Sequence, residues 1–381
     1  MDAFHSLTPG RRPLAAAACA LIALLADPGS AAARERPAAR PDPAVTPEPA
    51  AELAERLRPH GWTVHIDNDL FAFGNQDRDY TAGLSVTLGG EDAAGPKPLS
   101  AALDWLDDKT GFGADASSGD RARSFEAGLL LFTPQDLDSE APLYDDRPYA
   151  NLTYLSSSRL TQDPSGRVAY QSSFTVGVLG MPWVEHLHRS VHAAFGSRQP
   201  KGYEHQISEG GEPTFRYAVS RYRLLDSGRH RERPYHLRLG LSGSVGYLTE
   251  ASADLAFRWG SLDTPWWSST PSIADYGGHP PIRLAGERDA RSGPRWQVAA
   301  GVNLRLRAYN AFLQGQFRSS EVTFDASELN PVLLEAWLGV TTVFKNNLSV
   351  TYTLRHQTEE IRTGSGAREF SWASIGIAQQ F

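Results

Sequence analysis

The chain has 381 residues, a formal net charge of −7 and one cysteine. The negative balance and the lack of a basic stripe disfavour a nucleic-acid partner, and the lack of charge runs disfavours a tail that binds by electrostatics alone. The length is compatible with two soluble domains or with one β-barrel.

The N-terminal residues 1–33 are typical of a secretory signal peptide. Arg11 and Arg12 precede an apolar stretch of about 12 residues from Leu14 to Leu25, and a small-residue cleavage zone follows at 30–33. A transmembrane helix would need about 20 apolar residues. Cys19 lies inside the stretch, so the mature chain would contain no thiol. A buried helix and a lipid anchor at Cys19 are the alternatives, and the flanking sequence favours neither.

Residues 34–60 are rich in Pro, Ala, Glu and Arg and are typical of a linker with one short helix near 51–57. From Trp62 onward, apolar residues alternate with Ser, Thr, Gly, Gln and Arg in segments of roughly 8–14 residues, as in a barrel with a polar lumen. We therefore expect an all-β fold, an antiparallel transmembrane β-barrel over residues 61–381.

Thirteen segments have the strand pattern, whereas single-chain bacterial barrels have even strand numbers. We set aside 250–260, because a strand there would place the long polar segment 261–293 at the periplasmic end, where turns are short. A 12-stranded barrel remains, with extracellular segments that include 71–78, 134–147 and 181–212. Segment 90–122 falls on the periplasmic side and contains a helix-like A-A-L-D-W-L, for which the sequence suggests no role.

Three polar residues stand where the first two expected strands meet their loop. Asn68 and Asp69 offer the oxygen ligands that calcium prefers, although both residue types also begin ordinary turns. Asp67 should point away from Asn68 by alternation. The neighbours of Thr81 in the pattern are small or polar, which predicts that Thr81 faces the lumen, as a site residue or as an ordinary lumen threonine.

His192 is the strongest candidate for a catalytic base. It lies in E-H-L-H-R-S-V-H-A-A-F-G, a segment of helical character in an extracellular loop. A histidine needs only reach and a pKa near neutrality to act as a base. His188 and His192 have the i, i+4 spacing of zinc ligands, but no H-E-x-x-H motif accompanies them. A lone loop histidine is often inert, so the assignment depends on Asn68, Asp69 and Thr81 lying nearby.

Arg147 lies in Y-D-D-R-P-Y-A of another extracellular segment. It could bind a phosphate or sugar of a substrate, or pair with Asp145 or Asp146. Gly202, Tyr203 and Gln206 are interpreted as loop scaffolding. The sequence contains no G-x-S-x-G nucleophile elbow and no phosphate-binding glycine loop, so serine nucleophile chemistry has little support.

Seven motifs carry a resemblance to a known family. They are N-D-L-F, D-R-D-Y-T-A-G, F-T-P-Q-D, D-D-R-P-Y-A, V-G-V-L-G, V-H-A-A-F-G and K-G-Y-E-H-Q. In this order, from about residue 62 to 210, the chain resembles the lipid A 3'-O-deacylase family of outer-membrane barrels. Beyond them, the resemblance consists of the strand pattern and the terminal Phe381.

The resemblance implies a twelve-stranded outer-membrane barrel with its active site at the outer rim, between the wall and a helix of an extracellular loop. It implies calcium-dependent removal of the 3'-linked acyloxyacyl chain of lipid A, a component of lipopolysaccharide. Matched motif by motif, the catalytic residues are His192, Asn68, Asp69 and Thr81, with Asn68 and Asp69 also holding Ca²⁺. His192 would activate water, while calcium stabilises the oxyanion.

Two departures from the family pattern bear on this assignment. The acid that some members carry six residues after the histidine is Arg198 here, and a basic pair in the 134–147 loop is replaced by Asp138, Glu140 and Asp145. We expect a monomeric outer-membrane esterase that acts on lipid A. The alternatives are a non-enzymatic barrel, such as a porin or a structural protein, and a phospholipase with the same architecture.

Overall fold

A computed structural model describes residues 61–72, 78–90, 93–112, 121–262, 265–267, 295–344 and 348–380. The expected signal peptide and linker, with Cys19 and the short helix near 51–57, lie outside the described residues, and so does most of 261–293. Among the helices of the described ranges, none is long and apolar enough to cross a bilayer.

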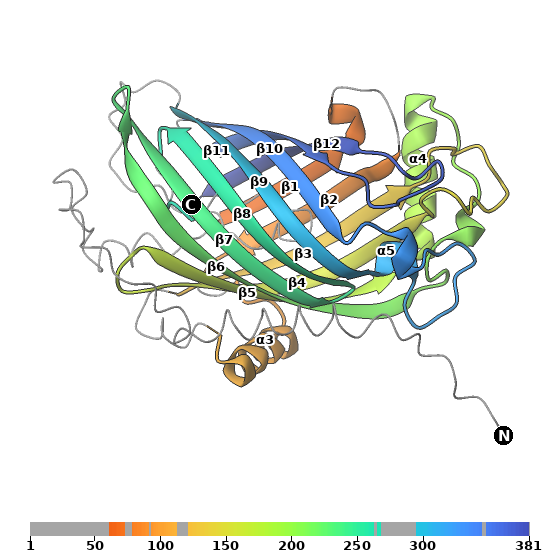
Figure 1. The fold of residues 1–381 in the computed structure, drawn as a ribbon, viewed down its shortest axis with the longest axis horizontal. Coiled ribbons are helices and arrows are strands. Elements are labelled where there is room, and N and C mark those ends of the chain that lie inside the picture. The colour runs from red at the N-terminus through yellow and green to blue at the C-terminus, as the bar shows by residue number, and fades with distance from the viewer. Residues whose placement is uncertain are drawn as a thin grey trace.

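Twelve antiparallel strands form one closed barrel, in which each strand pairs with its neighbours in sequence and β1 pairs with β12 (Figure 1). This confirms the predicted fold class. The strands are β1 Gly61–Asn68, β2 Asp79–Gly89, β3 Arg121–Thr133, β4 Ala150–Gln162, β5 Val168–Leu179, β6 Glu212–His230, β7 Arg233–Gly246, β8 Leu248–Gly260, β9 Arg295–Asn310, β10 Val332–Val343, β11 Leu348–Gln357 and β12 Phe370–Gln380.

Five short elements belong to the described loops. They are α4 Pro182–Phe195, α5 Ala311–Gln314, and the 3-10 turns η2 Asp69–Phe71 and η4 Tyr203–His205; a further 3-10 turn, η6, spans Ala326–Glu328. All of them lie at the barrel end where β1 stops and β2 starts, which we call the loop end. The opposite end, where β1 starts and β12 stops, is the terminal end. The helix α3 Lys97–Thr110 belongs to the connection at the terminal end.

The prediction that residues 310–320 form a strand and residues 250–260 do not was wrong. Residues 250–260 form β8, whereas 310–320 contain α5 and a loop instead of a strand. Asn310 caps α5 by accepting a hydrogen bond from the Phe312 N–H, and the apolar residues after it are buried together rather than on alternating faces. Consequently the segment that follows Gly260 begins at the terminal end, not among the extracellular loops as expected.

The two faces of the wall differ as the alternation predicts. Outward residues of β2 such as Leu84, Val86 and Leu88 are exposed, at 46%, 42% and 47%, while the intervening Ser85 and Thr87 are buried in the lumen. We call the band of exposed outward apolar residues the belt. Such a band is what a transmembrane barrel presents to lipid.

A chain of ion pairs crosses the lumen near the loop end. Glu250 of β8 accepts hydrogen bonds from Arg305 and Arg307 of β9, at 3.1 and 2.8 Å. Arg305 also pairs with Glu335 of β10 at 2.7 Å, and Arg355 of β11 lies 3.4 Å from Glu335. All these side chains are buried or nearly so. Each buried charge has a partner, so four neighbouring strands are held by charges that would be costly to separate.

The helix α3 packs on the outside of the wall, below the barrel in Figure 1. Leu88 of the belt pairs with Phe125, so Arg123, two residues before it, and its cross-strand partner Arg159 also face outward. Asp107 of α3 binds Arg159 at 2.7 Å and accepts hydrogen bonds from Ser172 and Tyr217 at 2.7 and 2.8 Å. Helix α3 of the 90–122 insertion therefore covers a polar patch on the outer wall.

The substitution Asp107→Ala tests this role of α3. It would leave Arg159 partly unpaired beneath α3, and removing one partner of a buried ion pair costs about 3–5 kcal/mol. The urea midpoint of the barrel in detergent micelles should fall clearly. Asp108→Ala, at the exposed neighbouring position, should leave it unchanged. Equal midpoints for both variants would contradict the assignment.

Candidate active site on the outer wall

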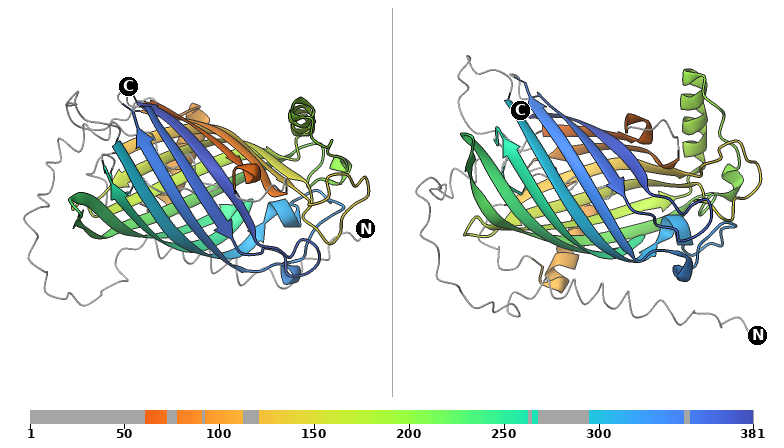
Figure 2. Two further views of the ribbon diagram at one scale, coloured as in Figure 1. Left: turned by 90° about the horizontal axis from the view of Figure 1, so that it is seen from above. Right: turned by 45° about the horizontal axis from the view of Figure 1, so that its top comes forward.

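The helix α4 runs crosswise to the barrel axis along the outside of the wall at the loop end. Figure 1 shows it from the side, and the left view of Figure 2 looks down its length. The segment was predicted to be helical, and the structure confirms it. The row Val184, His188 and His192 is buried along one side of this helix. Val184 forms an apolar cluster with Leu129 and Leu131 of β3, and Ala82 of β2 packs against this cluster, all on the outer face.

A β-bulge brings Thr81 to this outer face. The pairing of β2 with β3 shifts between Tyr80 and Ala82, so Thr81 is the extra residue. Tyr80 points into the lumen, where its hydroxyl donates to Asp67 at 2.8 Å, whereas Thr81 lies 2.6 Å from the hydroxyl of Thr133. Thr133 follows Leu131 by two residues and shares its outward side. The prediction that Thr81 faces the lumen was therefore wrong, because simple alternation ignores the bulge.

Gly83 is part of the same local arrangement. A Cβ at this position would lie 2.1 Å from the Tyr80 hydroxyl. The Tyr80 ring therefore occupies the lumen beside the bulge only because residue 83 has no side chain. The Y-T-A-G motif describes this geometry: the tyrosine goes inward, the threonine goes outward, and the glycine makes room.

Asn68 and Asp69 lie at the end of β1, and Asn68 is on the same side as Thr81. Asn68 pairs with Ala82, so its side chain belongs to the outer face, and its Oδ1 accepts a hydrogen bond from the Leu70 N–H at 2.7 Å. Asp69 begins η2, is buried, and accepts a hydrogen bond from the Arg78 N–H at 2.6 Å. Asp67 points into the lumen, away from Asn68, as predicted.

His192 is oriented by a backbone carbonyl. Its Nδ1 is hydrogen-bonded to the carbonyl oxygen of Arg198, just beyond the C-terminus of α4. Because a carbonyl only accepts, Nδ1 must carry the proton, and Nε2 of the neutral ring is then the basic nitrogen. Six residues after the histidine, the chain thus provides an acceptor through its backbone. An acidic side chain at position 198 is not needed for this contact.

His188 supports His192 from one turn away. The two rings are nearly perpendicular with centroids 4.3 Å apart. His188 Nδ1 is 2.7 Å from the Tyr203 hydroxyl, and Tyr203 stacks on Tyr149. Burial, together with the neighbouring His192 and Arg189, lowers the pKa of His188 to about 3. His188 is therefore neutral at pH 7. Among the described residues, no cluster of three or more His, Cys, Asp or Glu could hold a metal, so the zinc alternative gains no support.

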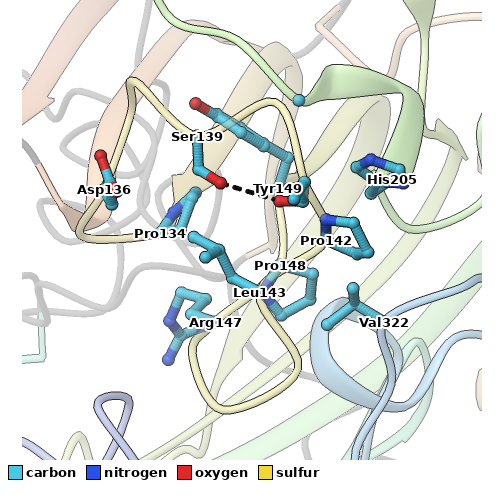
Figure 3. A pocket seen from close by; sticks show the side chains of 12 residues that line it. Pro134, Asp136, Ser139, Pro142, Leu143, Arg147, Pro148, Tyr149, His205 and Val322 are labelled. Carbon is cyan, nitrogen blue, oxygen red and sulfur yellow. Dashed lines mark hydrogen bonds between the residues drawn. The ribbon is translucent and has the colours of Figure 1, made fainter.

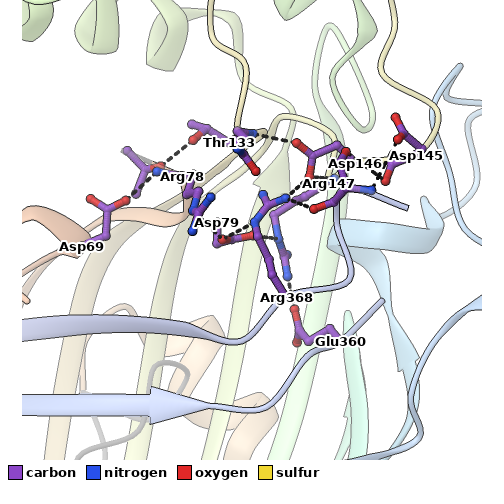
Figure 4. A network of polar contacts seen from close by, with 12 residues as sticks. Asp69, Arg78, Asp79, Thr133, Asp145, Asp146, Arg147, Glu360 and Arg368 are labelled. Carbon is purple, nitrogen blue, oxygen red and sulfur yellow. Dashed lines mark hydrogen bonds and ion pairs between the residues drawn. The ribbon is translucent and has the colours of Figure 1, made fainter. Parts of the chain in front are cut away.

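Arg147 lies on the lumen side, within the network of Figure 4. It is almost fully buried, pairs with Glu360, and has its Nε 3.5 Å from Asp79. Its guanidinium also lies over the rings of Phe132 and Phe370. The ion-pair alternative is thus the one that the contacts support, although with partners other than Asp145 and Asp146. Its role in substrate binding stays a prediction.

The acid Asp146 has a different partner. Arg368 joins Asp146 at 2.7 Å to Asp79 at 2.9 Å. Burial alone would lower the pKa of Arg368, but the two carboxylates raise it. Arg147 and Arg368 therefore tie β2, the 134–149 loop and the segment before β12 together. This network forms the inner support of the rim that carries Asn68 and Asp69.

A small pocket lies among the loops above this network (Figure 3). Pro134, Pro142 and Pro148 line it with Tyr149, and Arg147 closes one side. His205 borders it and bridges loops, through Glu321 at 2.6 Å and the Glu140 carbonyl at 3.0 Å. Arg147 is the only predicted site residue among the lining residues. We therefore assign the pocket to loop packing.

Acidic residues of the 134–149 loop, which depart from the family pattern, form ion pairs with basic residues of the segment after α4. Asp138 of the 134–149 loop binds Arg198 at 3.0 Å, and Glu140 binds Lys201 at 2.7 Å. Both pairs are exposed and contribute little stability. They do place the positive charges on the segment after α4 and the negative charges on the 134–149 loop, where the family pattern has basic residues.

The oxygen donors present fit calcium in kind. Asn68 and Asp69 offer an amide and a carboxylate oxygen, which are hard ligands, and both also accept one backbone hydrogen bond. Calcium takes 6–8 oxygen ligands. The remaining ligands would have to be backbone carbonyls, water or substrate oxygens.

Sequence reasoning missed three residues of this site. Thr133 contacts Thr81, and Tyr203 and Tyr149 hold His188. Tyr203 was interpreted as scaffolding, and its place in K-G-Y-E-H-Q was the only signal. Thr133 ends a strand in F-T-P-Q-D, and nothing in its neighbourhood indicates a partner 52 residues away.

Comparisons with known proteins agree with this architecture. A family model described as "Outer membrane protein LpxR" matches residues 19–381. Among solved structures, LpxR from Salmonella typhimurium is similar with a TM-score of 0.63 and 16% identity, over 84% of this chain and 100% of that chain. The β domain of the Bordetella autotransporter BrkA has a TM-score of 0.37 and 10% identity, over 84% and 99%. No curated protein matches the sequence.

The substitution Arg198→Ala tests the orientation of His192. Because the contact uses the backbone carbonyl, the variant should retain the Nδ1-protonated neutral ring. Nitrogen NMR of histidine-labelled protein in micelles, with His192 assigned through the loss of its signal in His192→Gln, would measure the tautomer. A change to the Nε2-protonated form in Arg198→Ala would contradict the assignment.

Proposed function

The chain belongs to the LpxR family of outer-membrane lipid A deacylases, and we propose that it hydrolyses the 3'-linked acyloxyacyl ester of lipid A. The observation that carries this proposal is the orientation of His192. Its Nδ1 is fixed by the Arg198 carbonyl on a helix that packs over the wall beside Ala82, the cross-strand partner of Asn68 and the neighbour of Thr81.

In this mechanism, Nε2 of His192 takes a proton from a water molecule that attacks the ester carbonyl. Neutral His188 keeps the ring in place without adding a positive charge beside it. The hydroxyl of Thr81, paired with Thr133, would orient the water or the carbonyl. Asn68 and Asp69 would hold calcium, which when bound stabilises negative charge on the ester oxygen. No covalent acyl-enzyme is required.

The placement of the site suits a lipid substrate. Asn68, Thr81 and α4 are on the outer face, next to the belt, so a lipid in the membrane could reach them without passing through the lumen. A phospholipase on the same architecture would use the same ester chemistry. Offering lipid A and phospholipid in parallel to the purified protein tells the two apart. We propose a monomer, since one chain carries every residue of the site.

The substitution His192→Ala should lower deacylation of lipid A by about 10²–10⁴-fold, the usual contribution of a general base. Mass spectrometry of the lipid product measures the rate, and heat-modifiable mobility on gels shows that the barrel is folded. His186→Ala, an exposed position on the same helix, should keep its activity, and a calcium chelator should stop the wild-type protein. Full turnover by His192→Ala would show that the base is another residue.

The porin alternative predicts an open lumen. The ion pairs among Glu250, Arg305, Glu335 and Arg355 leave these residues with 5% exposure or less, so the lumen is packed at this level. Reconstituted into planar bilayers, the protein should give no stable open-channel current. A steady conductance comparable to that of a porin would contradict this packing.

A further inference from the structure

One side of α4 carries an apolar row that the site does not use. Trp183, Leu187, Val191 and Phe195 follow one another at intervals of four residues, and they are 41%, 42%, 44% and 82% exposed. We call these four residues the α4 stripe. Apart from Phe195, they are as exposed as the belt residues Leu84, Val86 and Leu88. Rows of this kind at helical spacing are rarely left in water.

Helix geometry fixes how the stripe lies relative to the wall. Three of the stripe residues directly precede a residue of the buried row: Trp183 precedes Val184, Leu187 precedes His188, and Val191 precedes His192. One residue corresponds to about 100° around a helix of 3.6 residues per turn. Because the buried row faces the wall, the stripe lies about a quarter of a turn around the helix axis from the wall-facing side. Because α4 runs crosswise along the wall (Figure 2), that direction is along the barrel axis.

The stripe and outward apolar residues of the wall lie at the same end of the barrel. Val184, next to Trp183 in α4, clusters with Leu129 and Leu131, and Ala82 packs against this cluster on the outside of the wall. Ile66 of β1 and Leu70 and Phe71 of η2, at the same end, are also exposed. The remaining side of α4 is polar and exposes His186 and Ser190, with an ion pair between Glu185 and Arg189 at 2.8 Å. A helix with this division lies in a membrane interface.

We propose that α4 is an in-plane membrane helix whose stripe is seated in the acyl chains of the outer leaflet. Its partner is the bilayer, through apolar contact with lipid chains beside the belt. The buried row then carries His188 and His192 at the level where acyl chains begin. This inference concerns the position of the helix in the membrane, and it holds or fails independently of the proposed esterase activity.

Spin labels on single cysteines test the seating of the stripe. In a Cys19→Ser background, the full chain contains no other cysteine. Leu187→Cys and Val191→Cys report on the stripe, Ser190→Cys on the polar side of α4, and Leu84→Cys on the belt. Each labelled protein is reconstituted into vesicles of phosphatidylethanolamine and phosphatidylglycerol. Collision with oxygen, which concentrates in hydrocarbon, is compared with collision with a water-soluble nickel complex.

The labels at 187 and 191 should resemble the label at 84, with an oxygen-to-nickel ratio several-fold higher than at 190. Ratios at 187 and 191 equal to that at 190 would overturn the proposal, and so would a ratio at 190 as high as at 84. Quenching by brominated lipids is a second measurement on a nearly native chain. The fraction of tryptophan fluorescence that brominated lipids quench should be smaller in Trp183→Tyr than in the wild-type protein. An unchanged fraction would contradict the placement of the stripe in the acyl chains.

Discussion

The site depends on which face of the β2 wall each side chain takes. In a closed barrel, side chains alternate between lumen and exterior, and one inserted residue reverses this order locally. The bulge at Thr81 makes that reversal: Tyr80 stays in the lumen with Asp67, and Thr81 joins Asn68 and Ala82 outside. Without it, a threonine at this place would line the lumen, on the other side of the wall from α4.

A second constraint concerns His192. The proposed role as a base requires a lone pair on Nε2, and the contact between Nδ1 and the Arg198 carbonyl provides it. Arg198 itself turns outward to Asp138. The absence of an acid at position 198 therefore leaves the orientation of this ring unaffected. Compared with the family pattern, acidic side chains stand on the 134–149 loop and basic side chains on the segment after α4. The backbone contact that orients His192 is present.

Much of the fold followed from the alternation of apolar residues. Twelve strands, the closed barrel and the helix at 182–195 were predictable, because each reflects a local periodicity. The exchange of 250–260 for 310–320 shows the limit. Residues 250–260 were set aside because a strand there places the polar segment after Gly260 at the terminal end, where turns were expected to be short. The charged residues of this strand find partners elsewhere in the wall, Glu250 in Arg305 and Asp254 in Arg238. Such partners are distant in sequence and invisible before folding.

The motifs identified the candidate residues but did not predict how these residues are arranged in space. Asn68, Asp69, Thr81 and His192 could be named from the chain, whereas the outward turn of Thr81 and the contact with Thr133 depend on strand register. Arg147 illustrates the reverse case. Its position in a loop left substrate contact and an ion pair with Asp145 or Asp146 open. It is buried between Glu360 and Asp79, because segments far apart in sequence close over it.

A disulfide cross-link tests most directly whether the reactive side of this barrel is its exterior. Ala82→Cys and Val184→Cys, in a chain with Cys19→Ser, should form a disulfide under mild oxidation while the barrel stays folded, because both residues belong to one apolar cluster outside the wall. The pair Ser85→Cys and Val184→Cys, with residue 85 in the lumen, should not. Cross-linking of the second pair, or none in the first, would contradict an active site between α4 and the outer wall.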